Sequence, residues 1–473
     1  MNAQKQEQKL QKQQQRREAV LVKQQQKQIK KQKRVEKKAK LKIVRKELEA
    51  RRLRTISNWF RLDNAALVYP SAGRHGWTFV YRFSAVLKEP VSPEYLQQAV
   101  NDIMPRFPTF NVTLKNGLFW HYFDQKASFP KVQQEHEFPC SYFDLHGVEH
   151  LIRILYFHHR ISVEVFHSVS DGRGTLLFFN TLLHRYFSLQ QKPISSLKGC
   201  VNYLDIPSEE ETQDAFQVVT NHGKSNSHKE RKALKIKGTP EDEGKGGTTY
   251  GKMRAQVVKE LAKEYKTKLS IFLCSLLAYV VHKRNIGAKK PVKISVPIDL
   301  RPFFEKETLR NFSSYINVEI ENTQEKTLEE IIEVFSQAFQ KINKEFLLQN
   351  INANTKIQKN ACVKLLPLAL KDFVINISFK LLGEDYQTLA FSNIGVVQAP
   401  DEFSNHISHY EVNLGRPKYN TKGVAAICFN DSLVISFNSK IKERNLEKDF
   451  FRFLSAHNID VYIYTDRRDL YAK

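Results

Sequence analysis

One short segment near the middle of the chain constrains its fold more than any other. Residues 161–166 are mainly alternating apolar and polar residues, and they lead directly into His167. Successive side chains of a strand point to opposite faces, so the imidazole lies on the same side as the apolar residues of this strand. These residues are Ile161, Val163 and Val165. The apolar run 175–183 then predicts a buried helix, so the segment predicts a strand, a turn and a helix, with a histidine at the strand end.

The residues after this histidine indicate chemistry. Of the 15 histidines in the chain, only His167 is followed four places later by an aspartate, Asp171, and then by a glycine, Gly172. Neutral imidazole has a reference pKa of about 6.5 and can accept a proton from a hydroxyl or thiol at neutral pH. A histidine between a strand and a helix can face a cleft, as a general base must.

The spacing leaves the role of Asp171 open. The carboxylate can accept a hydrogen bond from the ring and set its tautomer, as in a serine triad. Alternatively, it points away from the ring and pairs with an arginine, while Gly172 permits the tight turn. A third interpretation is structural, with a core histidine and an aspartate that caps the helix. From the spacing alone, this structural interpretation is as good as the functional ones.

The pattern resembles the signature of the acyltransferase superfamily that contains chloramphenicol acetyltransferase, the condensation domains of peptide synthetases and alcohol acetyltransferases. Other segments resemble the same family in the same order, over residues 56–465, and the closest likeness is to bacterial alcohol-acetyltransferase-like proteins. These segments are 106–110, 296–301 with 311–318, and the Ser-Asn-Ile-Gly run of 391–395. The resemblance implies two chloramphenicol-acetyltransferase-like α/β sandwich lobes with an active-site tunnel between them.

The resemblance also implies roles for individual residues. His167 is implied to be the base that activates an alcohol for attack on an acyl thioester, with acetyl-CoA as the expected co-substrate and no metal. Asp171 is implied to be a structural support of the turn with Gly172, and Arg106 is the expected arginine partner of its carboxylate. Ser392 and Asn393 are candidates to line the tunnel and to donate a hydrogen bond to the oxyanion, although a polar strand end explains them equally well.

Two alternatives remain beside an acyl-CoA-dependent enzyme. Condensation domains carry a second histidine just before the base, whereas this chain has Phe166. This difference favours free acyl-CoA over a condensation-type reaction with a carrier-protein thioester. A non-catalytic binding module of the same fold is the other alternative, and the intact His167, Asp171 and Gly172 argue against it.

Composition and local patterns restrict the expected cellular location of the protein. The longest apolar run, 269–281, has 13 residues, fewer than the roughly 18 that a membrane helix requires. The N-terminus shows no signal-peptide pattern. The five cysteines are scattered, without a Cys-x-x-Cys pair, as suits a reducing cytosol. We therefore expect a cytoplasmic protein, acting as a monomer on a small alcohol.

Charge is concentrated at one end of the chain. Residues 1–54 carry 20 Lys and Arg against 5 Glu, whereas the remainder has 54 basic and 45 acidic residues. Residues 1–55 are therefore predicted to be a basic, Gln/Lys-rich extension that is helical or disordered. It can attract an anionic partner such as RNA or lipid headgroups, but a solubilising extension without a specific partner is the favoured interpretation.

The remaining residues predict two lobes. Residues 56–205 form the expected first lobe, 206–249 a polar linker with few apolar anchors, and 250–473 the second lobe. Strands and helices mix without a strict βαβ repeat, as in α/β sandwich lobes. The expected strands are 79–87, 110–114, 118–123, 151–157, 161–166, 292–296, 425–429, 433–437 and 461–464. The expected helices start near 92 and 257 and span 269–282, 328–342 and 446–457.

Two turns carry specific expectations. Asn116 and Gly117 predict a tight hairpin between the strands 110–114 and 118–123. The pair His158 and His159 can suggest a metal site, but no carboxylate or cysteine stands beside it at ligand spacing. We therefore expect a polar turn at these two histidines.

Overall fold

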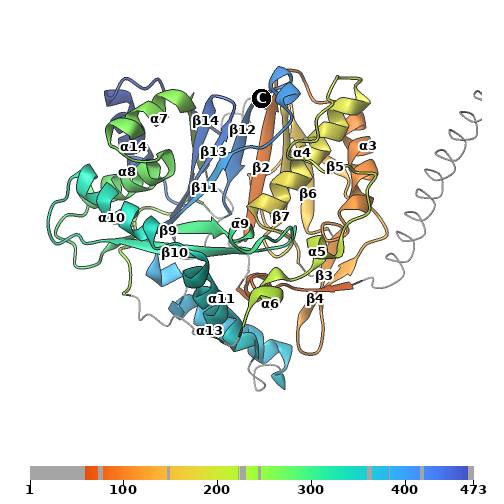
Figure 1. Cartoon of the computed structure of the whole chain (residues 1–473), viewed down its shortest axis with the longest axis horizontal. Coiled ribbons are helices and arrows are strands. Elements are labelled where there is room, and N and C mark those ends of the chain that lie inside the picture. The colour runs from red at the N-terminus through yellow and green to blue at the C-terminus, as the bar shows by residue number, and fades with distance from the viewer. Residues whose placement is uncertain are drawn as a thin grey trace, which may run out of the picture. The chain divides into compact units, whose positions relative to one another are not determined.

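The computed structural model describes residues 59–72, 78–145, 150–221, 223, 231–242, 247–359, 365–382, 384–415 and 420–466. The predicted basic extension, residues 1–55, lies outside the described residues. The described part contains two large β-sheets with helices packed against them, as predicted (Figure 1).

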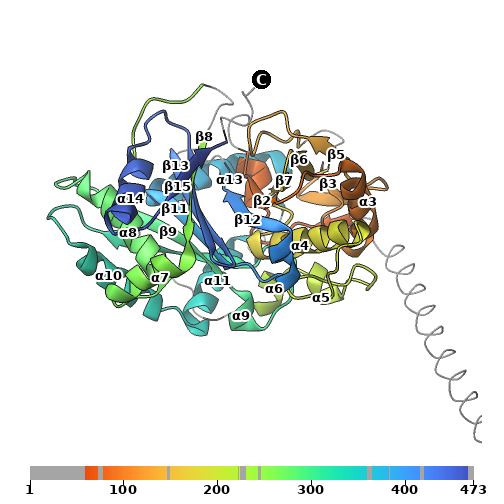
Figure 2. The same cartoon turned by 90° about the horizontal axis from the view of Figure 1, so that it is seen from above.

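The first large sheet carries the segment that ends in His167. Its strand order is β12-β2-β7-β6-β5. The bounds are β2 Val80–Leu87, β5 Val132–Gln134, β6 Ile152–Phe157, β7 Arg160–Phe166 and β12 Ile407–Asn413. The helices α3 (Pro93–Ile103) and α4 (Gly172–Leu189) pack against each other and share one core with this sheet (Figures 1 and 2). Every residue of β7 is buried, because the strand lies inside the sheet and both of its faces are covered.

The second large sheet has the order β10-β9-β11-β13-β14-β8-β15. Its strands are β8 Gly247–Arg254, β9 Val292–Asp299, β10 Ser313–Ile320, β11 Leu389–Val396, β13 Lys422–Phe429, β14 Ser432–Ser439 and β15 Tyr462–Thr465. Four helices belong to its core: α7 Ala255–Glu264, α8 Leu269–Lys283, α10 Leu328–Gln340 and α14 Asn445–Ala456. Helix α8 is apolar on nearly all sides because α7, α10, α14 and the sheet surround it.

A small third sheet joins β1 (Trp59–Arg61), β4 (His121–Gln125) and β3 (Val112–Asn116) in that order. The tight hairpin predicted at Asn116 and Gly117 is wrong. Asn116 pairs with His121, so four residues, 117–120, connect the two strands. Gly117 accordingly has no positive φ, which a two-residue turn would require.

The remaining helices connect these layers. The longer ones are α11 (Lys344–Lys359) and α13 (Leu368–Leu382). The short ones are α2 Val68–Ala72, α5 Glu209–Thr212, α6 Ala215–Val219 and α9 Arg301–Phe304, with 3₁₀ turns at Met104–Arg106, Glu384–Tyr386 and Asp401–Asn405. Within the described ranges, none of these segments is a helix with the length and apolar character needed to span a membrane.

The predicted lobe boundaries need two corrections. The strand β12 comes from the C-terminal half but pairs antiparallel with β2, so residues 250–473 are not confined to the second lobe. The predicted linker 206–249 contains the ordered helices α5 and α6, and β8 begins inside it at Gly247. Phe216 of α6 is buried with its ring centroid 5.1 Å from that of Phe312, so this segment has an apolar anchor that its polar composition concealed.

Candidate active site

His167 lies one residue beyond the end of β7, at the position that the alternating pattern predicts. Its backbone N–H donates to the carbonyl of Phe79 at 2.8 Å, so the antiparallel pairing of β7 with β2 continues one residue beyond Phe166 and Val80. Two aromatic rings hold the imidazole. Tyr69 of α2 stacks on it with centroids 4.7 Å apart, and Tyr81 of β2 lies tilted at 4.8 Å.

The imidazole lines a cavity of about 160 Å³ between the two sheets. The walls come from β2, β11, β12, the N-terminus of α4 and the residues after β12. The lining residues are Phe79, Val80, Tyr81, Phe83, His167, Gly172, Ser392, Ile394, Val412, Leu414 and Gly415. The cavity is therefore mostly apolar, with the histidine and the Ser392 hydroxyl among its few polar groups.

The two ring nitrogens of His167 have different surroundings. Nδ1 lies 3.2 Å from Oδ1 of Asn311, whereas no described residue forms a hydrogen bond with Nε2. Burial lowers the pKa of His167 below its usual value. A hydrogen bond with the backbone of His167 itself, the charge of Asp171, the bond with Asn311 and the charge of Asp63 oppose that effect. The ring is therefore neutral at pH 7, and a neutral imidazole with an unused nitrogen can accept a proton.

Asp171 turns away from the imidazole. Its two oxygens accept a bidentate pair of bonds from Arg301, each at 3.0 Å. They also accept the backbone N–H groups of Gly174 at 3.1 Å and of Phe312 at 2.8 Å. With four donors, the carboxylate both caps α4 and ties the turn to α9 of the other half of the chain. Its position fits the structural role that the resemblance implies.

The partner expected for this aspartate is wrong. Arg106 does not reach Asp171; its two Nη groups donate to Glu211 at 2.5 and 2.7 Å. Arg106 ends the 3₁₀ turn after α3 and lies next to α5, whereas Arg301 lies beside the His167 turn. The guanidinium of Arg301 is fully used, because it also donates to Asp299 and to the carbonyls of Thr308 and Arg310.

The expected reason for Gly172 is also wrong. This residue has no positive φ, so the turn does not require a glycine there. A Cβ at Gly172 would meet Ile394 at 3.5 Å and Phe83 at 3.7 Å, which are ordinary contacts inside the cavity. The glycine that the packing requires is Gly174, where a Cβ would lie 2.2 Å from the carbonyl oxygen of Leu309.

The two polar residues predicted for the tunnel differ in position. Ser392 lines the cavity with His167. The amide of Asn393 is used elsewhere, because its Nδ2 donates to the hydroxyl of Ser270 at 2.8 Å and its Oδ1 accepts the N–H of Gly395 at 3.0 Å. Phe166, which stands where condensation domains have a second histidine, is buried in the core and does not line the cavity.

Sequence reasoning missed five residues around the imidazole and its turn: Asp63, Tyr69, Tyr81, Arg301 and Asn311. Arg301 and Asn311 lie inside the segments quoted for the resemblance, but no local pattern assigned either a contact. Asp63 accepts bonds from the Asn311 backbone and side chain at 3.3 and 3.1 Å, across 248 positions of sequence. The sequence around Asp63 contains no pattern that predicts so distant a partner.

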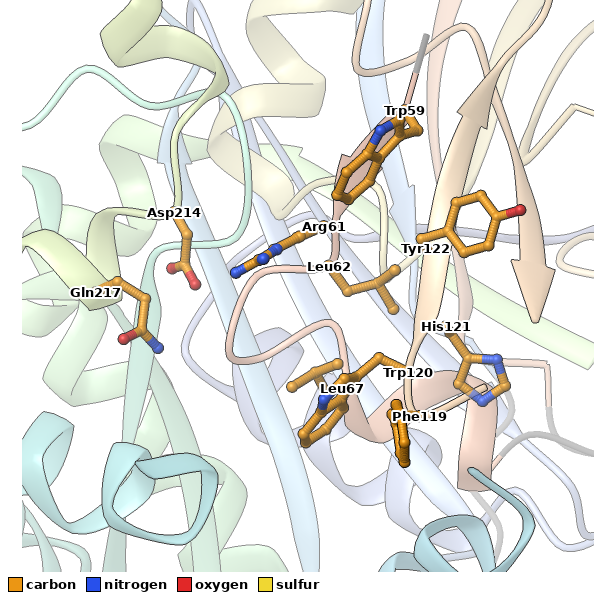
Figure 3. Close-up of a pocket in the computed structure, with 10 residues that line it drawn as sticks. All are labelled: Trp59, Arg61, Leu62, Leu67, Phe119, Trp120, His121, Tyr122, Asp214 and Gln217. Atoms are coloured by element: carbon orange, nitrogen blue, oxygen red, sulfur yellow. The ribbon is translucent and has the colours of Figure 1, made fainter. Parts of the chain in front are cut away.

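A larger cavity, of about 1010 Å³, lies elsewhere and has an aromatic wall (Figure 3). Its lining residues are Trp59, Arg61, Leu62, Leu67, Phe119, Trp120, His121, Tyr122, Asp214 and Gln217. It shares no lining residue with the His167 cavity. Burial and the charge of Asp63 raise the pKa of Asp214 to about 6. The larger volume does not by itself identify the reactive site. We assign the chemistry to the smaller cavity, because it contains the imidazole of His167.

His158 and His159 form the turn between β6 and β7, as expected. Within the described ranges, no group of three histidine, cysteine, aspartate or glutamate side chains is placed to hold a metal ion.

Comparison with known proteins shows the fold. No family model and no curated protein matches the chain. Among solved structures, F. graminearum TRI101 complexed with coenzyme A and T-2 mycotoxin aligns with 86% of this chain and 100% of its own, at 10% identity and a TM-score of 0.58. The first condensation domain of the CDA synthetase aligns with 85% and 96%, at 12% identity and a TM-score of 0.54.

A third solved structure with a similar fold is a domain of a different name. The epimerization domain from the third module of tyrocidine synthetase B aligns with 81% of this chain and 91% of its own, at 12% identity and a TM-score of 0.51. The chain thus has the two-lobed α/β fold of these solved structures. Domains with different names share this fold, so an activity has to be inferred from the site.

Proposed function

We propose that the chain is an acyltransferase that moves a short acyl group from acyl-CoA to an alcohol, with His167 as general base. The observation that carries the proposal is the imidazole itself. It is neutral at pH 7, has one nitrogen engaged by Asn311 and the other without a described partner, and lines a cavity between the two lobes. Positioned general-base catalysis is worth about 10²–10⁴-fold in rate.

The proposed reaction has two steps at this one base. Nε2 of His167 accepts the hydroxyl proton as the alcohol oxygen attacks the thioester carbonyl, which forms a C–O bond and an oxyanion. The oxyanion then collapses, the C–S bond breaks, and the leaving thiolate takes the proton from the imidazolium. Ser392 is the proposed hydrogen-bond donor to the oxyanion, because it lines the cavity while the Asn393 amide is occupied.

The size of the cavity supports a short acyl group, such as acetyl. About 160 Å³ is well below the roughly 300–1,000 Å³ of pockets that enclose a drug-sized ligand. The cavity therefore accommodates the reacting ends of two substrates, and the rest of each must lie outside it. Coenzyme A is the proposed donor because a relative of the same fold is described in complex with coenzyme A.

The direct test is acyl transfer with purified protein. Labelled acetyl-CoA is incubated with a panel of alcohols, amines and thiols, and ester, amide and thioester products are separated. We expect ester formation that the His167→Ala variant loses. Equal turnover by that variant would reject His167 as the base.

A carrier-protein thioester is the second candidate donor, because a condensation domain aligns nearly as well as the coenzyme A complex. The same acyl group is offered on free coenzyme A and on a phosphopantetheinylated carrier protein. Turnover with the carrier alone would replace the first proposal. Failure to bind coenzyme A or any thioester in a thermal-shift assay would instead favour a non-catalytic binding module.

The basic extension is proposed to be dispensable for this chemistry. Residues 1–54 carry a net charge of +15, whereas the rest of the chain is only mildly basic. A protein that begins at Thr55 should keep its turnover and lose affinity for heparin or anionic vesicles. Lost turnover would show that the extension takes part in the reaction.

A further inference from the structure

The amide group of Asn311 has only one orientation that satisfies its surroundings. Its Nδ2 lies 3.1 Å from a carboxylate oxygen of Asp63 and 3.2 Å from the carbonyl oxygen of Ser168. Both neighbours are acceptors, so the NH₂ group must face them. The amide oxygen, Oδ1, is therefore the atom that faces Nδ1 of His167 at 3.2 Å.

This orientation acts on the tautomer of the imidazole together with the hydrogen bond between the ring and the backbone of His167 itself. An amide oxygen can only accept, so Nδ1 of His167 must carry the proton that it shares with Asn311. A neutral imidazole has a single N–H group, which leaves the lone pair on Nε2. Nε2 is the nitrogen without a described partner, on a ring that lines the cavity.

Asp63 is the group that holds the amide in place. Its side chain is fully buried, and Asp63 is the acceptor in each of its hydrogen bonds with described residues. Oδ1 accepts the N–H of Ala66 at 2.8 Å, and Oδ2 accepts the backbone and side-chain N–H groups of Asn311. The guanidinium of Arg310 lies 3.6 Å from Oδ2. Burial raises the pKa of Asp63, and the charge of Arg310 and the hydrogen bonds from Ala66 and Asn311 oppose that effect. These neighbours are donors or a cation, which match a carboxylate rather than a protonated carboxyl.

We propose that Asn311 and Asp63 are positioning residues that keep His167 in the Nδ1–H tautomer, so that Nε2 is the base. The inference rests on the proposed function for its effect on rate, but the tautomer itself does not depend on a substrate. An aspartate commonly orients a catalytic histidine directly. Here Asp171 is committed to Arg301, and an amide with a buried carboxylate behind it takes that position.

The decisive variant is Asp63→Asn, which keeps the volume and introduces an NH₂ group. That group can donate to Asn311, whose amide can then turn and present its own N–H to Nδ1. His167 would be driven to the Nε2–H tautomer and would lose its lone pair at the reacting position. In serine proteases, replacing the orienting aspartate by asparagine lowers kcat by about 10⁴-fold for this reason. We expect kcat to fall by at least about 10²-fold, with KM for acetyl-CoA little changed.

The independent readout is ¹⁵N NMR of histidine-labelled protein without substrate, which distinguishes Nδ1–H from Nε2–H rings. His167→Gln assigns the resonance. His282 is an internal control, because its Nδ1 faces Oδ1 of Asn322 at 2.8 Å and its Nε2 accepts the N–H of Lys326 at 3.0 Å. We expect Nδ1–H for both rings in the unsubstituted protein, and a change at His167 alone in Asp63→Asn.

A second variant keeps the inference testable if Asp63→Asn does not fold. Asn311→Ala removes the amide without adding a donor, and we expect a mixture of tautomers at His167 with a reduced kcat. If His167 stays Nδ1–H in every variant that folds, or if kcat is unchanged, the inference is overturned. If the tautomer changes but the unsubstituted protein transfers no acyl group, the positioning holds and the proposed acyltransferase function fails.

Discussion

Two histidine–asparagine pairs in this chain have similar contacts and opposite consequences. In one, Nδ1 of His167 faces Oδ1 of Asn311 at 3.2 Å; in the other, Nδ1 of His282 faces Oδ1 of Asn322 at 2.8 Å. In both, the amide nitrogen donates to a backbone carbonyl, that of Ser168 or of Lys290. The asparagine by itself therefore does not mark a reactive histidine.

The difference lies in the second ring nitrogen. Nε2 of His282 accepts the backbone N–H of Lys326 at 3.0 Å, so this ring is used on both sides and is fully buried. It joins the end of α8 to the start of α10. His167 has no such bond among the described residues, and its ring lines a cavity. A histidine becomes a candidate base where the fold leaves one nitrogen unused beside open space.

The largest predicted effect separates the two histidines by substitution. His167→Ala should lower kcat/KM for acyl transfer by about 10²–10⁴-fold. His282→Ala should leave kcat/KM nearly unchanged but lower the unfolding free energy, since the Lys326 N–H and the Asn322 oxygen lose their partner at a cost of about 1–3 kcal/mol each. Turnover and urea unfolding measure the two effects. If the His282 variant loses activity while it remains folded, the contrast between a reactive His167 and a structural His282 is wrong.

The next prediction concerns the ion pair beside His167. Arg301→Ala leaves Asp171 buried without its bidentate partner, so the unfolding free energy should fall by about 3–5 kcal/mol. Arg106→Ala is the matched control, because Glu211 is 13% exposed and water can replace part of the lost contact. Urea unfolding should show the smaller loss for Arg106. An equal or larger loss there would show that the Arg301–Asp171 pair does not contribute more to stability than the Arg106–Glu211 pair.

The two glycines at the start of α4 should respond differently to alanine. Gly174→Ala forces a Cβ against the Leu309 carbonyl and the Ser170 hydroxyl, which should cost about 1–3 kcal/mol of stability. Gly172→Ala should leave stability unchanged and narrow the cavity, with a raised KM for the larger acyl groups. Thermal unfolding and a series of acyl-CoA chain lengths separate the two. Equal stability losses would mean that Gly172 has a structural role after all.

The smallest predicted effect is on pH dependence. Burial lowers the pKa of His167, although the charges of Asp63 and Asp171 oppose the shift, so the acid limb of kcat/KM should lie below pH 6.5. The unfolded state binds the proton more readily than the folded state. The stability that neutral His167 contributes is therefore present above about pH 6.5, the unfolded-state pKa, and is lost as the pH falls from there through the lower pKa of the folded state. His167→Ala should flatten this part of the stability profile; an unchanged slope would contradict the lowered pKa.

Local patterns determined much of this protein before its fold was considered. The alternation of 161–166 predicted β7 and the face on which His167 lies, and the apolar run 269–281 predicted α8. Both succeed because a period of two or 3.6 residues reports burial of the segment that carries it. The family resemblance, and the mixture of strands and helices without a strict βαβ repeat, also predicted the two-lobed α/β fold.

Only the tertiary structure decided which groups meet. The Arg301 that pairs with Asp171 lies 130 positions away, and the Asn311 that faces His167 lies 144 positions away. The contact between Asp63 and Asn311 joins residues 248 positions apart, and β12 returns from the C-terminal half to the first sheet. Ion pairs and amide orientation depend on long-range packing, which leaves no periodic trace in the sequence. The chain by itself therefore determined that the imidazole would lie at a strand end. The packing of the two lobes decided that Asn311 holds one of its nitrogens, while the other has no partner among the described residues and the ring lines a cavity.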